Sequence, residues 1–104
     1  MSIKSRLELH QALVDILGTK EVYYQPPSSI QMKYPAIVYS RADIRNTSAN
    51  NKTYIQKHVY TITVMDRNPD SPIVEAISKL PNCRYDRPFK ADNINHDVFT
   101  IVTL

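Results

Sequence analysis

Residues 54–66 read YIQKHVYTITVMD, and they are followed by RNPD (67–70) and by SPIVEAISKLP (71–81). Apolar residues alternate along residues 59–64, which is the two-residue period of a β-strand. Ser71 and Pro72 then have the character of a helix N-cap and first helical residue. Apolar residues recur at helical spacing before Pro81 ends the segment: Ile73, Ala76, Ile77 and Leu80. This strand-turn-helix block predicts a helix that lies on a sheet.

A second helix is predicted over residues 2–17, SIKSRLELHQALVDIL, because the segment lacks proline and glycine and stops at Gly18. One face carries Leu9, Ala12, Leu13, Ile16 and Leu17. Beside it runs a second apolar strip of Ile3, Leu7 and Val14. One sheet covers only one side of a helix, so this strip requires another covering surface. We expect either a neighbouring subunit or a loop of the same chain.

The remaining segments favour strands joined by polar turns. EVYYQ (21–25) and AIVYSR (36–41) are rich in β-favouring residues, and a loop that begins at Pro26 and Pro27 separates them. Residues 43–52, DIRNTSANNK, have the composition of an exposed hairpin tip. Two final strands are predicted over 83–90 and 97–104. The resulting α-β-β-β-α-β-β order predicts one α+β domain over residues 1–104, with a mainly antiparallel sheet and two helices packed on one face.

Composition limits the classes of function. The 13 Lys and Arg against 10 Asp and Glu give a charge of +3, and the two signs are interspersed, which is a weak basic bias. Cys83 is the only cysteine, so no intrachain disulfide forms, and this suits a reducing cytoplasm. No secretory signal or bilayer-length apolar stretch is present, so we expect no membrane partner. Gly18 is the only glycine, which excludes glycine-rich phosphate loops.

The sequence predicts no enzyme and no catalytic, cofactor or metal site. The three histidines lie in different predicted elements without a metal-binding spacing: His10, His58 and His96. His96 and Asp97 are neighbours on a strand and should point to opposite faces. Cys83 lacks a nucleophile signature, and the acidic residues at 66, 70 and 75 match no cation-binding loop.

Tyrosine is the most informative residue type, because the chain has seven and no tryptophan. Tyrosine combines an apolar ring with a polar tip and is enriched at protein interfaces. We expect Tyr39 and Tyr60 to pack in the sheet, whereas Tyr24 and Tyr34 flank the proline-rich loop and suit an interface equally well. The candidate contacts with a subunit or partner are Ile3, Leu7, Val14, Tyr24, Pro26, Pro27, Met32, Tyr34, Arg45, Asn50 and Lys52.

Five sequence segments, which together span nearly the whole chain, resemble those of a known protein family. They are LELHQALVDILG (7–18), VYYQPP (22–27), MKYPAIVYSR (32–41), YTITVMDRNPDSPIVEAISKLP (60–81) and ADNINHDVFTIVTL (91–104). In this order they resemble the small tail terminator, or tail completion, proteins of long-tailed phages and prophages.

The resemblance implies a fold similar to the phage lambda tail terminator and a homo-hexameric ring in the tail or neck of the virion, assembled in the host cytoplasm. Such a ring caps the tail tube protein, offers its other face to the head-tail connector or stopper, and lets DNA pass through its channel without sequence-specific binding. Related neck proteins have similar folds, so a head completion or stopper role is an alternative. A small nucleic-acid-binding module is the other alternative, and a steep salt dependence of DNA binding would distinguish it.

Overall fold

A computed structural model of the chain describes residues 3–49 and 53–103. The elements follow the order α1 (Arg6–Leu17), β1 (Val22–Tyr24), β2 (Ala36–Ala49), β3 (Thr53–Asp66), α2 (Pro72–Ser78), β4 (Cys83–Ala91) and β5 (Ile94–Thr103). The strands form one sheet in the order β1-β2-β3-β5-β4. Only β1 and β2 run parallel, and the other neighbouring pairs are antiparallel. The predicted α+β class and element order are therefore confirmed.

Both helices begin at serine caps. The Ser5 hydroxyl accepts a hydrogen bond from the Glu8 backbone N–H at 3.2 Å, so α1 starts at Arg6 and the prediction that it starts at residue 2 is wrong. At the other end Gly18 has a left-handed φ of 80°, and its N–H donates to the Val14 carbonyl at 2.8 Å, as expected of a terminal glycine. Ser71 caps α2 as predicted, with its hydroxyl accepting from the Ile73 N–H.

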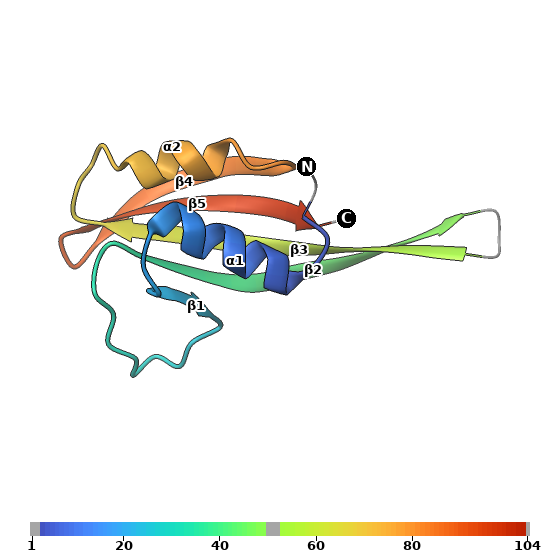
Figure 1. Ribbon diagram of the computed structural model, residues 1–104, viewed down its shortest axis with the longest axis horizontal. Coiled ribbons are helices and arrows are strands. Elements are labelled where there is room, and N and C mark those ends of the chain that lie inside the picture. The colour runs from blue at the N-terminus through green and yellow to red at the C-terminus, as the bar shows by residue number, and fades with distance from the viewer. Residues whose placement is uncertain (1–2, 50–52, 104) are drawn as a thin grey trace.

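Both helices cover the same face of the sheet, and the main core lies between these two layers (Figure 1). Leu9 and Leu13 of α1 and Ile77 of α2 are completely buried. Beneath them the sheet contributes Ile37, Tyr39, Tyr60, Ile62, Val64, Phe99 and Ile101. The predicted packing of Tyr39 and Tyr60 within the sheet is confirmed, since both are buried.

The opposite face of the sheet has a smaller cover that comes from the loop of residues 25–35. Met32 and Tyr34 of this loop pack against a buried cluster of Ala36, Met65 and Ile94. Ala36 precedes Ile37 on β2, so its side chain points away from the main core. No helix among residues 3–49 and 53–103 covers this face (Figure 1).

The hairpin formed by β2 and β3 is longer than predicted. Its pairing runs from Ala36↔Met65 to Ala49↔Thr53, so residues 43–49 are strand and their assignment to a hairpin tip is wrong. The polar composition of residues 43–49 favours a turn, but the facing strand pairs with every one of them, and the single register shift of this hairpin lies just before them, between Arg41 and Asp43. Beyond the main body the two strands project alone (Figure 1), and the molecule measures 50 × 28 × 23 Å.

The hairpin of β4 and β5 is also tighter than predicted, because Ile94 and the residues after it join the strand. Asp92 and Asn93 both have positive φ angles, 53° and 62°, and they link the paired residues Ala91 and Ile94. Two consecutive left-handed residues are typical of a type I′ turn, which shortens the expected six-residue connection to two.

Candidate interaction surfaces

The predicted apolar strip of Ile3, Leu7 and Val14 does not form one continuous exposed surface. Ile3 is 8% exposed and belongs to the core, and Val14 packs against the same cluster as Val74 of α2. Since α2 lies beside α1 (Figure 1) and contributes Val74 to this cluster, Ile3 and Val14 are covered within the chain and need no neighbouring subunit. Leu7 differs, because it is 70% exposed and remains a candidate contact.

The residues of the proline-rich loop lie mostly against their own sheet. Tyr24 is half-buried, with its ring centroid 5.0 Å from that of Tyr39. Tyr34 is half-buried as well and lies 5.7 Å from the Arg67 guanidinium. Pro26 and Met32 are partly covered, whereas Pro27 is exposed, so the loop offers a narrower contact surface than its composition suggests.

The hairpin carries the last three predicted contact residues. Arg45 is exposed and forms an ion pair with Asp43 at 3.8 Å, a surface pair that contributes little to stability. Asn50 and Lys52 lie outside the described residues.

A pocket of about 250 Å³ lies at the base of the hairpin, beside the start of α1, and we call it the basic pocket. Among the described residues its lining consists of Lys4, Ser5, Arg6, Arg41, His58, Tyr60 and Thr103, which include three cationic side chains and no carboxylate. The sequence does not reveal this pocket, because its residues come from distant segments and show no local spacing. They meet because β2 and β5 flank β3 in the sheet and the chain at the start of α1 lies beside this end of the three strands.

Arg6 is the best-fixed cation of the basic pocket. Its Nη1 donates to the Tyr39 hydroxyl oxygen at 3.2 Å, and its guanidinium carbon lies 4.6 Å from the centre of the Tyr24 ring. The Tyr39 hydroxyl also lies 2.7 Å from Nδ1 of His10. Burial, followed by the charge of Arg6, lowers the pKa of His10, so its imidazole is neutral at pH 7 and accepts this bond. Burial raises the pKa of Tyr39.

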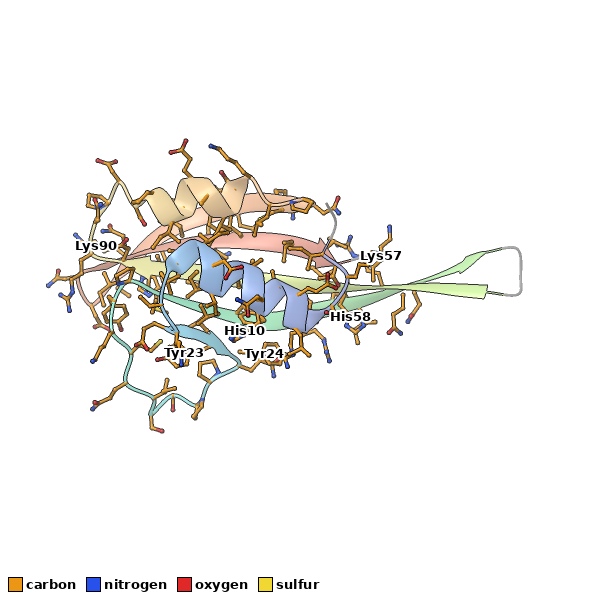
Figure 2. All side chains as sticks on the ribbon, viewed as in Figure 1. His10, Tyr23, Tyr24, Lys57, His58 and Lys90 are labelled. Atoms are coloured by element: carbon orange, nitrogen blue, oxygen red, sulfur yellow. The ribbon has the colours of Figure 1, made fainter. Side chains whose placement is uncertain are left out.

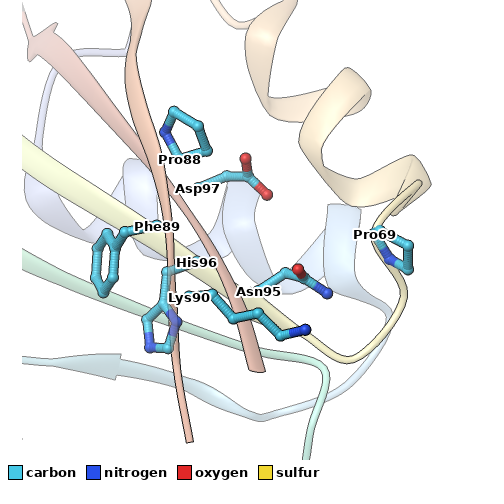
Figure 3. Close-up of a pocket in the computed structure, with 7 residues that line it drawn as sticks. All are labelled: Pro69, Pro88, Phe89, Lys90, Asn95, His96 and Asp97. Carbon is cyan, nitrogen blue, oxygen red and sulfur yellow. The ribbon is translucent and has the colours of Figure 1, made fainter. Parts of the chain in front are cut away.

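A second pocket of about 300 Å³ lies at the opposite end of the sheet (Figures 2 and 3). Pro69, Pro88, Phe89, Lys90, Asn95, His96 and Asp97 line it. His96 stacks on Phe89 with ring centroids 4.4 Å apart, and its Nδ1 donates to the Ile94 carbonyl at 2.9 Å. Asp97 instead accepts from the Tyr85 hydroxyl at 2.7 Å. His96 and Asp97 therefore hydrogen-bond to different partners and do not form a His-Asp dyad.

Two features bear on possible chemistry: the grouping of metal-ligating side chains and the state of the Cys83 thiol. Across residues 3–49 and 53–103, no three His, Cys, Asp or Glu side chains gather closely enough to hold a metal ion. Burial raises the pKa of the Cys83 thiol to about 11, so the thiol is protonated and weakly nucleophilic at neutral pH. Burial and the bond to Asp97 raise the pKa of Tyr85 to about 12.

Comparison with known proteins assigns no family to this α+β chain. No protein-family model matches it, and a search of curated proteins found no significant match. Within the described part of the chain, no helix has the length and apolar character needed to cross a membrane.

Proposed function

We propose that this chain is a structural subunit that assembles with copies of itself into a ring, hexameric by the resemblance in its sequence. The ring closes the tail tube of a phage and joins it to the head connector. The projecting hairpin of β2 and β3 is the observation that carries this proposal.

The outer part of this hairpin lacks the support that a sheet normally gives. β5 accompanies β3 only from His58 to Asp66, so no third strand of the described chain pairs with the segment from Arg45↔Lys57 to Ala49↔Thr53. Five such pairs extend for about 16 Å at roughly 3.3 Å per residue. A two-stranded ribbon is at best marginally stable in water. A partner that covers the ribbon would stabilise it, as a neighbouring subunit in a ring does.

The two edges of the sheet favour a closed assembly over an open-ended one. The β4 edge contains Pro88 and a register shift between Tyr85 and Arg87, and both interrupt strand addition. On the other side β1 has only three residues, and beyond Tyr39 the edge is β2 itself, which is interrupted by the bulge between Arg41 and Asp43. Since neither edge is suited to continuous pairing, contacts through the hairpin and the exposed faces are the better route to assembly. Such head-to-tail contacts produce a ring when their rotation closes.

Electron microscopy of tail tubes tests this function. Tubes from the same phage, purified without their terminator, are mixed with the chain and the tube ends are averaged. We expect an added layer with sixfold symmetry at one end only. A hairpin-shortened variant, in which Asn-Gly replaces residues 46–56 between Arg45 and Lys57, should leave the ends bare while its circular dichroism still shows a folded body.

The substitution Lys79→Gln at the exposed C-terminal end of α2 serves as the control and should cap tubes like the unmodified chain. Bare tube ends at saturating concentrations of the unmodified chain would refute the terminator function. Normal capping by the hairpin-shortened variant would refute the role of the ribbon.

A further inference from the structure

The basic pocket brings together three cationic side chains that form no ion pair with a described carboxylate. Arg45, Lys79 and Arg84 each have an acidic partner within 4 Å. Lys4, Arg6 and Arg41 have none among the described residues, although they line one pocket. Three like charges that share a pocket repel one another, and a bound anion would relieve this repulsion.

The geometry of the pocket suits an oxyanion. Arg6 is held by Tyr39 and by the ring of Tyr24, so its position is fixed before any ligand arrives. Lys4 and Arg41 are exposed and free to close on a ligand. A guanidinium provides paired N–H donors that match the oxygens of a phosphate group. His58 belongs to the same lining, and its Nδ1 is buried with no hydrogen-bond partner in the described part of the chain.

Hydrogen-bonding side chains continue from the pocket onto one face of the hairpin. Nε2 of His58 lies 3.1 Å from Oε1 of Gln56, whose Nε2 donates to Oδ1 of Asn46 at 3.0 Å. Asn46 and Gln56 are register partners, so they share a face of the ribbon with His58. This row of amides and imidazole extends well beyond the size of one phosphate ion, and it suits a ligand with a repeated polar backbone.

We propose that the basic pocket binds phosphate groups of a nucleic-acid backbone without reading the base sequence. Tyr60 is the aromatic residue of the lining besides His58, and it is only 2% exposed, so its ring is not available for stacking on bases. The interaction is therefore electrostatic, with the amide row positioning the strand. Phosphate binding at this pocket requires neither the assembly of subunits into a ring nor the capping of a tube, because all the lining residues belong to one chain.

Salt-dependent binding to the isolated chain tests this proposal. Fluorescence anisotropy measures the affinity for a labelled 20-nucleotide single strand of mixed sequence between 50 and 200 mM salt. Three phosphate contacts predict a slope of about −2.1 for log K against log salt concentration, from about −0.7 per contact. The double substitution Lys4→Gln/Arg41→Gln removes two contacts and should bring the slope to about −0.7. A second strand of unrelated sequence should bind equally well.

The matched control is Arg87→Gln/Lys90→Gln, which removes the same charge from exposed residues of β4. Lys90 lies at the end of the molecule opposite His58 (Figure 2). This control should retain the slope of the unmodified chain, and both double variants should retain its melting temperature. Equal slopes for the two double variants would overturn the proposal, because binding would then follow net charge alone. Competition by polyglutamate or inorganic phosphate at concentrations equal to the oligonucleotide would overturn the nucleic-acid assignment.

Discussion

Replacing Tyr39 by phenylalanine removes one hydroxyl group from the base of the basic pocket and keeps the buried ring. The hydroxyl accepts from Arg6 at 3.2 Å and donates to His10 at 2.7 Å, and Tyr39 is 1% exposed. Without it Nδ1 of His10 loses its donor in a part-buried position. An unsatisfied buried group costs about 1–3 kcal/mol, whereas Arg6 can turn to water. We therefore expect Tyr39→Phe to lower the free energy of unfolding by about 1–3 kcal/mol.

Urea denaturation followed by circular dichroism measures this change. At a slope of about 1.5 kcal/mol per molar urea, the midpoint should fall by roughly 0.7–2 M with the slope unchanged. Tyr60→Phe is the matched control, because Tyr60 is equally buried in the same sheet but none of the described side-chain hydrogen bonds involves its hydroxyl. The control should lose less than about 0.5 kcal/mol. Equal losses in the two variants would refute the role assigned to the Tyr39 hydroxyl.

Three further predictions follow from burial and titration. Leu13→Ala should cost about 2–5 kcal/mol in urea denaturation, because Leu13 is completely buried, whereas Leu7→Ala on the same helix should cost less than about 0.5 kcal/mol; similar costs would contradict the orientation of α1. Cys83 should react with iodoacetamide slowly at pH 7.5 and faster only as pH approaches its raised pKa of about 11, and rapid labelling of the native chain at pH 7.5 would contradict this. The pKa of His10 is lowered below 6.5, so the unfolded chain takes up a proton before the folded chain does, and stability should fall as pH drops from 7.5 to 5; His10→Gln should reduce this loss, and an unchanged loss would refute the assignment.

The arrangement of the elements was predictable because strong local signals mark them. The alternation of apolar residues in 59–64 and their helical spacing after Ser71 each lie within a single segment. Such local patterns can be read from the sequence without knowledge of the tertiary structure. Residues 43–49 were different, since their Asn and Ser content favours turns in isolation. Backbone pairing with a facing strand overrode that local preference.

The surfaces were less predictable than the fold. The sequence shows that the strip of Ile3, Leu7 and Val14 is apolar, but only the tertiary structure shows that Ile3 and Val14 join the core while Leu7 stays exposed. The basic pocket depends on even more distant pairings, because Arg41 and Thr103 meet only through the strand order of the sheet. Neither relation leaves a periodic signal in the sequence.

The place of β5 in the sheet has a consequence for biosynthesis. It is the last strand of the described chain, yet it lies between β3 and β4, and β4 has no other neighbour in the sheet. Phe99 and Ile101 of this strand complete the core. A nascent chain therefore cannot close its sheet until residues 94–103 have left the ribosome exit tunnel, and until then the apolar faces of α1 and β3 are without their full cover. Folding of this domain therefore waits for the synthesis of β5, and until then chaperones have access to these surfaces.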